Sequence, residues 1–119
     1  MKFFKFVSVV LGLIFSMETL ANPKFSNDLL RKAENGDVLA QYNLGWVYQN
    51  SQDVIQNYEK AFEWYSKAAN QGNAQAQYNL GSLYQNGQGV EKDDKKAFEW
   101  YRKAASNGHS QAKLVLSGL

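Results

Sequence analysis

The 119-residue sequence contains no cysteine and a single histidine, His109. Without cysteine, no disulfide can stabilise the chain and no lipid can be attached through a cysteine side chain. One histidine cannot supply the nitrogen and sulfur ligands of a typical structural metal site. We therefore expect no metal, no cofactor, and a fold held by apolar burial alone, which is feasible but marginal for about a hundred residues.

Long apolar runs are confined to the N-terminus. Lys2 and Lys5 accompany a mostly apolar run at residues 6–15, and residues 19–21 (TLA) offer the small side chains that a signal peptidase reads. A bilayer span needs about 20 apolar residues, so this run is too short. The pattern predicts a cleaved signal peptide at residues 1–21 and a periplasmic or secreted protein with no stable membrane insertion. An uncleaved anchor is the alternative.

A surplus of charge of one sign is also absent. The chain has 13 lysine and arginine residues against 11 aspartate and glutamate residues, a formal net charge of +2. The two signs alternate, as in residues 91–96 (EKDDKK), which is typical of a solvated surface. We therefore expect no nucleic-acid partner. With 45% hydrophobic residues, the chain has the composition of one small globular domain.

What the sequence does contain is a repeat with a period of 36 residues. The segment KAFEWYSKAA at residues 60–69 returns as KAFEWYRKAA at residues 96–105. Without gaps, residues 37–72 match residues 73–108 at 21 of 36 positions. A period of this length indicates stacked supersecondary units, so we predict two full repeats, at 37–72 and 73–108.

Each repeat is predicted to contain two helices, which we call helix A and helix B. In the first helix A, Ala40, Leu44 and Val47 recur every three or four residues, as on one side of an α-helix. Helix B has a wider apolar arc, which suits a helix with more than one packing neighbour. The residues of that arc are Ala61, Trp64, Tyr65, Ala68 and Ala69. No window alternates with a period of two residues, so the expected fold is all-α.

Residues with special backbone preferences mark the helix ends. Gly36, Gly72 and Gly108 each follow an alanine-containing segment, where a left-handed glycine ends a helix. Asn57 and Asp93 lie just before the B helices, as N-cap residues do. These signals predict the same helix boundaries in both repeats.

Two glycines, Gly45 and Gly81, lie inside the A helices. Glycine costs about 0.5–1 kcal/mol there relative to alanine. Its presence in both copies predicts a close approach of two helix backbones.

The two ends are predicted to be half-repeats that cap the array. Residues 22–36 match the end of a helix B, with Ala33 in the position of Ala69. Residues 109–119 match the start of a helix A, with Ala112 in the position of Ala76. The expected order is B, AB, AB, A.

These residues resemble the Sel-one-like repeat (SLR) family, 36-residue relatives of the tetratricopeptide repeat, over nearly all of residues 28–119. The family pattern resembles A-x-x-x-L-G-x-x-Y-x-x-G-x-G-V-x-x-D-x-x-K-A-x-x-W-Y-x-K-A-A-x-x-G. The first repeat departs from it at residues 51–53 (SQD) and at Asn57. The second repeat carries the whole pattern: Ala76, Leu80, Gly81, Tyr84, Gly87, Gly89, Val90, Asp93, Lys96, Ala97, Trp100, Tyr101, Lys103, Ala104, Ala105 and Gly108.

The resemblance implies a short right-handed α-solenoid of antiparallel helix pairs that works as a protein-interaction scaffold. Exported bacterial members of the family are known as regulators, host-interaction factors, envelope-assembly adaptors and immunity partners of secreted toxins. A cysteine-rich, disulfide-bonded branch is linked to β-lactam binding, and the absence of cysteine disfavours that branch here.

The repeated aromatic and acidic residues are better explained by packing than by chemistry. The Trp-Tyr pairs at 64–65 and 100–101 lie on the apolar arc of helix B, where aromatic rings fill the space between helices. A duplicated ligand box is the alternative. Glu63 and Glu99 point to the opposite side as surface residues, whereas glycosidase chemistry needs paired carboxylates in a cleft. His109 occupies a helix start, which favours a capping role over a catalytic one. Residues 87–89 (GQG) suit a turn between helices better than a phosphate-binding loop. No catalytic residue is predicted.

The candidate partner-binding residues lie on helix A, opposite its buried side. In tetratricopeptide-like stacks this side lines the concave groove, where an exposed aromatic residue can anchor a partner. Trp46 is the clearest case, because its counterpart in the second repeat is Ser82. It serves either as a groove anchor or as a cover over Leu29 and Leu30. The candidates are Leu39, Tyr42, Trp46, Gln49, Gln75, Tyr78, Ser82 and Gln85.

The sequence therefore predicts an exported, non-enzymatic scaffold that binds a protein or peptide in its groove. The alternative is an enzyme or small-molecule binder of the periplasm that acts on the cell wall or on β-lactams. Weak self-association is a third possibility, because two full repeats leave the ends of the stack poorly covered.

Overall fold

The computed structural model describes residues 22–118. The predicted signal peptide, residues 1–21, lies outside the described residues. The described chain is all-α and contains no strand, as the sequence predicts. Its six helices are α2 (Asn27–Glu34), α3 (Val38–Asn50), α4 (Tyr58–Asn70), α5 (Ala74–Asn86), α6 (Asp94–Ser106) and α7 (Ser110–Ser117).

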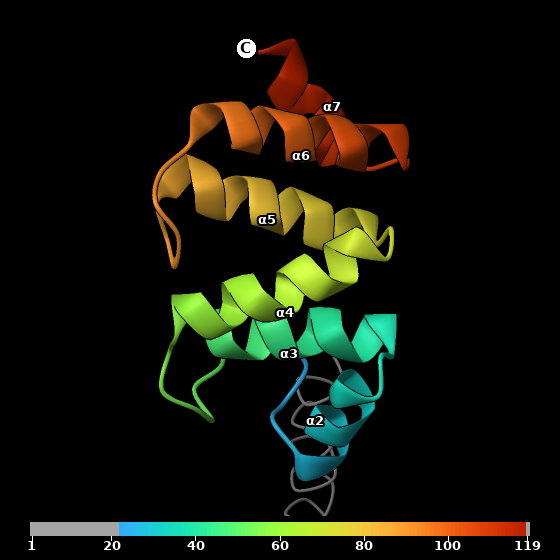
Figure 1. The fold of residues 1–119 in the computed structure, drawn as a ribbon, viewed down its shortest axis with the longest axis vertical. Helices are drawn as coiled ribbons and strands as arrows, with labels where there is room; N and C mark the ends of the chain where they lie inside the picture. The colour runs from blue at the N-terminus through green and yellow to red at the C-terminus, as the bar shows by residue number, and fades with distance from the viewer. Residues whose placement is uncertain (1–21, 119) are drawn as a thin grey trace, which may run out of the picture.

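The helices stack in chain order, from α2 at one end to α7 at the other (Figure 1). Helices α3 and α4 form one antiparallel pair, α5 and α6 form the next, and α4 packs on α5 to join them. The two shortest helices, α2 and α7, close the ends. The order B, AB, AB, A is therefore confirmed, and the fold is a short α-solenoid. Within residues 22–118, no helix has both the length and the apolar character needed to cross a bilayer.

The predicted cap residues have the expected geometry. Asn57 and Asp93 each accept a hydrogen bond from the amide three residues later, at 3.0 Å, and so begin α4 and α6. Gly36, Gly72 and Gly108 follow α2, α4 and α6 with φ between 90° and 96°. Because each cap is a local interaction, the same short motif sets the same boundary in every repeat.

The loop of the second repeat shows why the first repeat departs from the family pattern there. A Cβ at Gly89 would lie 2.2 Å from the backbone oxygen of Tyr58, at the start of α4. The equivalent residue in the first repeat is Asp53, which precedes the first full B helix of the array. Only the second loop lies against the start of an earlier full helix B, so only that loop needs a glycine at this position.

Two groups of buried side chains form the core. The N-terminal cluster contains Ala33, Ala40 and Leu44, with Leu29 and Leu30 packed against it. The central cluster lies where α4 and α5 meet, and its members are Ala61, Tyr65, Ala68, Ala69, Ala76, Leu80 and Leu83. Most of these residues are alanine, so the helices lie close together, and Tyr65 is the largest side chain that is fully buried.

Gly45 and Gly81 make room for a tyrosine ring. A Cβ on Gly45 would lie 2.6 Å from Cδ1 of Tyr65, and a Cβ on Gly81 would lie 2.8 Å from Cε1 of Tyr101. At Gly81 a backbone oxygen, that of Ala97, is the third neighbour, at 3.2 Å. The expected close approach of a second backbone is seen at Gly81, and at Gly45 the aromatic side chain of helix B is the nearest neighbour.

Candidate partner-binding site

The eight candidate residues come from the two full A helices. Helix α3 carries Leu39, Tyr42, Trp46 and Gln49, and α5 carries Gln75, Tyr78, Ser82 and Gln85. Their spacing of three or four residues puts each set on one side of its helix. We call this surface of α3 and α5 the A-helix face.

In the first repeat, Tyr65 of α4 joins two of the candidates. Its hydroxyl donates a hydrogen bond of 2.7 Å to Oε1 of Gln49, and the centroid of its ring lies 5.9 Å from that of Tyr42. Burial raises the pKa of both Tyr65 and Tyr42. One buried tyrosine thus contacts two of the four α3 candidates.

In the second repeat, Tyr101 of α6 repeats this arrangement. Its hydroxyl donates a hydrogen bond of 2.8 Å to Oε1 of Gln85, and its ring centroid lies 5.5 Å from that of Tyr78. Burial raises the pKa of Tyr101, and the nearby Tyr78 adds to this rise. The structure therefore brings two of the four α5 candidates, Tyr78 and Gln85, together around one buried tyrosine.

Tyr65 and Tyr101, which the sequence predicts as packing residues, also contact the candidate binding residues. The rings are buried, but each hydroxyl reaches a glutamine of the A-helix face and fixes its orientation. A sequence signal for this pairing exists, because glutamine and tyrosine are 16 residues apart in both repeats.

Trp46 and Leu39 occupy different environments. Trp46 is half-buried and packs against the central cluster, whereas Leu29 and Leu30 pack against the N-terminal cluster. Trp46 therefore packs on the cluster that α4 and α5 form. Leu39 is 62% exposed, which makes it the apolar candidate most accessible to a partner.

His109 caps α7 and closes the far end of the A-helix face. The amide of Ala112 donates to Nδ1 of His109 at 3.1 Å, so the proton is on Nε2, which donates to Oε1 of Gln75 at 2.8 Å. The imidazole also stacks on Tyr78, with 4.6 Å between centroids and an interplanar angle of 14°. The predicted helix-start position of His109 is thus confirmed.

Folding stability is expected to fall between pH 7.5 and pH 5 because of His109. Burial lowers the pKa of His109 below its ordinary value of 6.5. A proton on Nδ1 would also remove the acceptor for Ala112 and place a positive charge at a helix N-terminus. Because the folded-state pKa is the lower one, this contribution is complete above about pH 6.5 and is lost as pH falls through the folded-state pKa. Thermal unfolding at a series of pH values measures the loss.

His109→Asn supplies the control, because asparagine already caps α4 and α5 in this protein. The groups of α5 that face the ring are the side-chain amide of Gln75 and the ring of Tyr78. The variant should therefore show a smaller fall in Tm between pH 7.5 and pH 5 than the wild type. Equal falls in the two proteins would contradict the assignment.

The repeated tryptophans and glutamates do not converge on a site. Trp64 and Trp100 are half-buried against the N-terminal and central clusters, respectively. The ammonium groups of Lys67 and Lys103 lie 4.6 Å and 4.3 Å from the centroids of these rings. Packing is the interpretation that these contacts support, and the exposed positions of Glu63 and Glu99 match the prediction.

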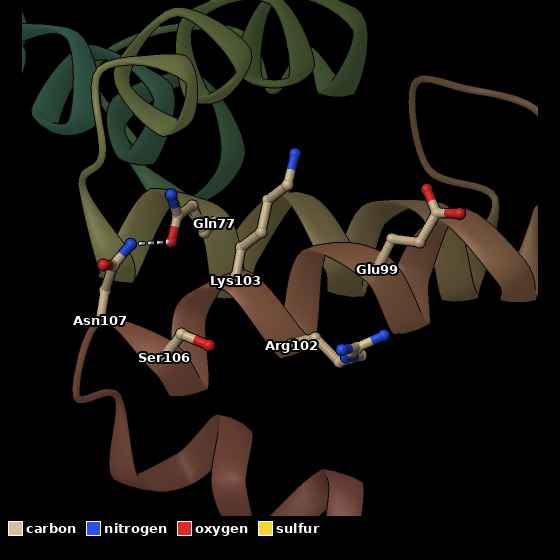
Figure 2. A pocket seen from close by; sticks show the side chains of 6 residues that line it. All are labelled: Gln77, Glu99, Arg102, Lys103, Ser106 and Asn107. Carbon is tan, nitrogen blue, oxygen red and sulfur yellow. Dashed lines mark hydrogen bonds between the residues drawn. The ribbon is translucent and has the colours of Figure 1, made fainter.

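A surface hollow of about 530 Å³ lies along α6 (Figure 2). At one end of it, Nδ2 of Asn107 donates a hydrogen bond of 2.9 Å to Oε1 of Gln77. The first repeat has the same bond between Gln71 and Gln41, at 2.8 Å. The buried Gln41 and Gln77 also donate hydrogen bonds to the carbonyl oxygens of Ala33 and Ala69, respectively. The hollow therefore contains part of a hydrogen-bond network that links successive repeats. Its lining residues are Gln77, Glu99, Arg102, Lys103, Ser106 and Asn107.

The two basic residues of the hollow contact aromatic rings. Lys103 lies over Trp100, and the guanidinium carbon of Arg102 lies 6.0 Å from the ring centroid of Phe98. Across the part of the chain that the structure describes, no group of three or more histidine, cysteine or acidic residues could hold a metal ion. In the same residues, every buried side-chain nitrogen and oxygen has a hydrogen-bond partner.

The stacked helix pairs and their repeated tyrosine–glutamine contacts define a helical-repeat protein of the solenoid class. The Sel1-repeat family model matches residues 38–73 and 74–109, and the chain therefore belongs to the Sel1-repeat family. Each matched segment begins one residue later than the repeats predicted at 37–72 and 73–108. No protein with a curated description matches the chain.

Solved structures show the same fold. A Sel1-repeat protein from Oxalobacter formigenes is 43% identical over 76% of this chain and 68% of its own, with a TM-score of 0.75. The protective antigen c5321 of uropathogenic Escherichia coli strains is 43% identical over 71% of this chain, with a TM-score of 0.69. The Helicobacter pylori cysteine-rich protein B is 29% identical over 73% of this chain, with a TM-score of 0.70.

The chain spans only 18% of c5321 and 65% of the Helicobacter protein. The latter is cysteine-rich by name, whereas this chain has no cysteine. Sel1-repeat proteins generally mediate protein–protein interactions, and the family is typically non-enzymatic.

Proposed function

We propose that this protein is an exported, non-enzymatic scaffold that binds another protein or peptide on its A-helix face. The observation that carries the proposal is the group of accessible apolar and aromatic side chains there. Leu39 is 62% exposed, and Tyr42, Trp46 and Tyr78 are only half-buried although each contacts the core or a neighbouring ring. Aromatic residues of this kind commonly supply most of the binding energy at protein interfaces.

The proposal includes export through the predicted signal peptide at residues 1–21, to the periplasm or the medium. Within that location the scaffold would serve as an adaptor, a regulator, a host-interaction factor or the immunity partner of a toxin. Export is tested by fractionation of cells and by the N-terminal sequence of the mature protein. A mature chain that begins after Ala21 is the expected result, and a cytoplasmic full-length chain would contradict this part of the proposal.

Replacing Leu39 by glutamate is expected to abolish partner binding and leave folding intact. The side chain is largely in solvent, so its loss removes little core packing, whereas a carboxylate would have to be desolvated under a partner. Binding is measured by site-specific photocrosslinking in cells, with the probe at position 42 or 78, followed by identification of the adduct. Thermal unfolding of purified Leu39→Glu should give a Tm within about 2 °C of the wild type.

The matched control is Ile55→Glu, which alters an even more exposed apolar residue in the loop before α4. That variant should retain every adduct. Trp46→Ala is expected to reduce both binding and stability, because Trp46 packs on the central cluster as well as facing the partner. Identical adducts from wild type, Leu39→Glu and Trp46→Ala would overturn the proposal.

A further inference from the structure

The two full A helices, α3 and α5, lack charged residues. Neither α3 nor α5, each of 13 residues, contains a lysine, arginine, aspartate or glutamate, although such residues make up 20% of the chain. The B helices are different: α4 and α6 carry acidic residues in the first turn and basic residues in the last. The two sides of the stack therefore differ in charge and not only in shape.

Charged groups at the edge of the A-helix face have partners of their own. Asp37 accepts a hydrogen bond of 2.7 Å from the amide of Ala40 as the N-cap of α3. Lys92 donates to the carbonyl oxygen of Gln85, at 3.1 Å, and to Asp94, at 3.2 Å. Lys113 of α7 is the repeat counterpart of Gln77, which lines the hollow of Figure 2. Burial lowers the pKa of His109, so its ring is neutral at pH 7 and above.

The polar groups of the face are amides with a defined orientation. Oε1 of Gln49 and Oε1 of Gln85 each accept the hydroxyl of a buried tyrosine, which leaves the Nε2 hydrogens to donate outward. The two glutamines are equivalent positions in successive repeats, so these donors recur along the stack. Amide donors that recur at a fixed interval suit the carbonyl oxygens of a peptide backbone.

We propose that the A-helix face selects an uncharged peptide segment, with apolar or aromatic side chains against Leu39, Tyr42 and Tyr78 and its backbone carbonyls on Gln49 and Gln85. This inference rests on the proposed function. A charged side chain on this face would lose its hydration and gain no counter-charge, so it would be rejected. Because no charge pair forms, binding should depend little on salt concentration.

The test is selection of random 12-residue peptides, displayed on phage, on the immobilised protein. Recovered sequences are synthesised, and their dissociation constants are measured by fluorescence anisotropy at 50 mM and 500 mM NaCl. We expect peptides with an uncharged central segment whose affinity changes by less than about twofold between the two salt concentrations. Leu39→Glu should weaken them by about tenfold or more, which places them on the A-helix face.

Charge insertion provides matched variants. Ser82→Glu and Ser82→Lys place a charge on the A-helix face, whereas Ser106→Glu and Ser106→Lys place it on an exposed position of α6. The two Ser82 variants should lose affinity for the neutral peptides by about tenfold and select peptides of opposite charge, with salt-dependent binding. The Ser106 variants should behave as the wild type.

The outcomes separate this inference from the proposed function. Charged, salt-sensitive peptides that still compete for the A-helix face would overturn the selection rule and leave the scaffold function standing. Peptides that bind equally to wild type and Leu39→Glu would argue against the face itself. A neutral face of tyrosine and amide side chains could also hold sugars, so peptidoglycan fragments are tested by the same assay. Binding of those fragments without any peptide would overturn both proposals.

Discussion

Replacing Tyr65 by alanine is expected to lower the free energy of unfolding by about 3–5 kcal/mol, as in other removals of a large buried aromatic ring. Tyr65 is the largest fully buried side chain and belongs to the central cluster that joins the two repeats. A small domain has a total stability of about 5–15 kcal/mol, so the variant should be unfolded to a large extent at moderate temperature. Urea denaturation followed by circular dichroism measures the loss.

Tyr65→Phe separates the ring from its hydroxyl. The variant keeps the packing but removes the hydrogen bond to Gln49, which is worth about 0.5–1.5 kcal/mol. It should therefore fold and lose much less stability than the alanine variant. Leu39→Ala, at an exposed position, should change stability by no more than about 0.5 kcal/mol. A Tyr65→Ala protein that unfolds at the wild-type urea concentration would show that the central cluster does not join the repeats.

Much of the fold follows from short-range signals that the sequence displays twice. The caps at Asn57 and Asp93 are formed by a side chain and an amide three residues away, and the glycines that end the helices act over one turn. Such interactions need no knowledge of the tertiary structure. The in-frame repetition of 36 residues then orders the helices, because equivalent helices must pack in equivalent ways.

The contacts that the sequence did not reveal are those between helices. The sequence predicts a close approach at Gly45 but not that its nearest neighbour is Tyr65, on a different helix. It leaves Trp46 either as a groove anchor or as a cover over Leu29 and Leu30, and only the structure places it against the central cluster. The placement of the eight candidates on the A helices follows from periodicity. The contacts that four of them make with Tyr65 and Tyr101 depend on the angle at which each helix B crosses its helix A.

Each repeat thus uses one tyrosine for stability and for the A-helix face. The ring of Tyr65 lies against Gly45 in the core, and its hydroxyl orients Gln49 on the surface. Tyr101, Gly81 and Gln85 repeat this unit. A change in core packing should therefore change the orientation of the glutamine on the A-helix face, because one rigid tyrosine side chain contacts both.

The replacement of Gly45 by alanine is expected to destabilise the protein, although alanine is normally the better helix residue by about 0.5–1 kcal/mol. The new Cβ would lie 2.6 Å from Cδ1 and 2.8 Å from Cε1 of Tyr65. The ring is fully buried and cannot move away without disturbing the central cluster. Overpacking of this kind costs about 1–3 kcal/mol, which we expect as the loss in free energy of unfolding by urea denaturation.

A double-mutant cycle tests the cause. In a Tyr65→Leu background the ring is absent, so Gly45→Ala should be neutral or stabilising, and the coupling between the two changes should exceed about 1 kcal/mol. If Tyr65→Leu does not fold, the equivalent cycle with Gly81→Ala and Tyr101→Leu applies, where a Cβ would lie 2.8 Å from the ring. Additive effects in both cycles would mean that these glycines are present for a reason other than the tyrosine beside them.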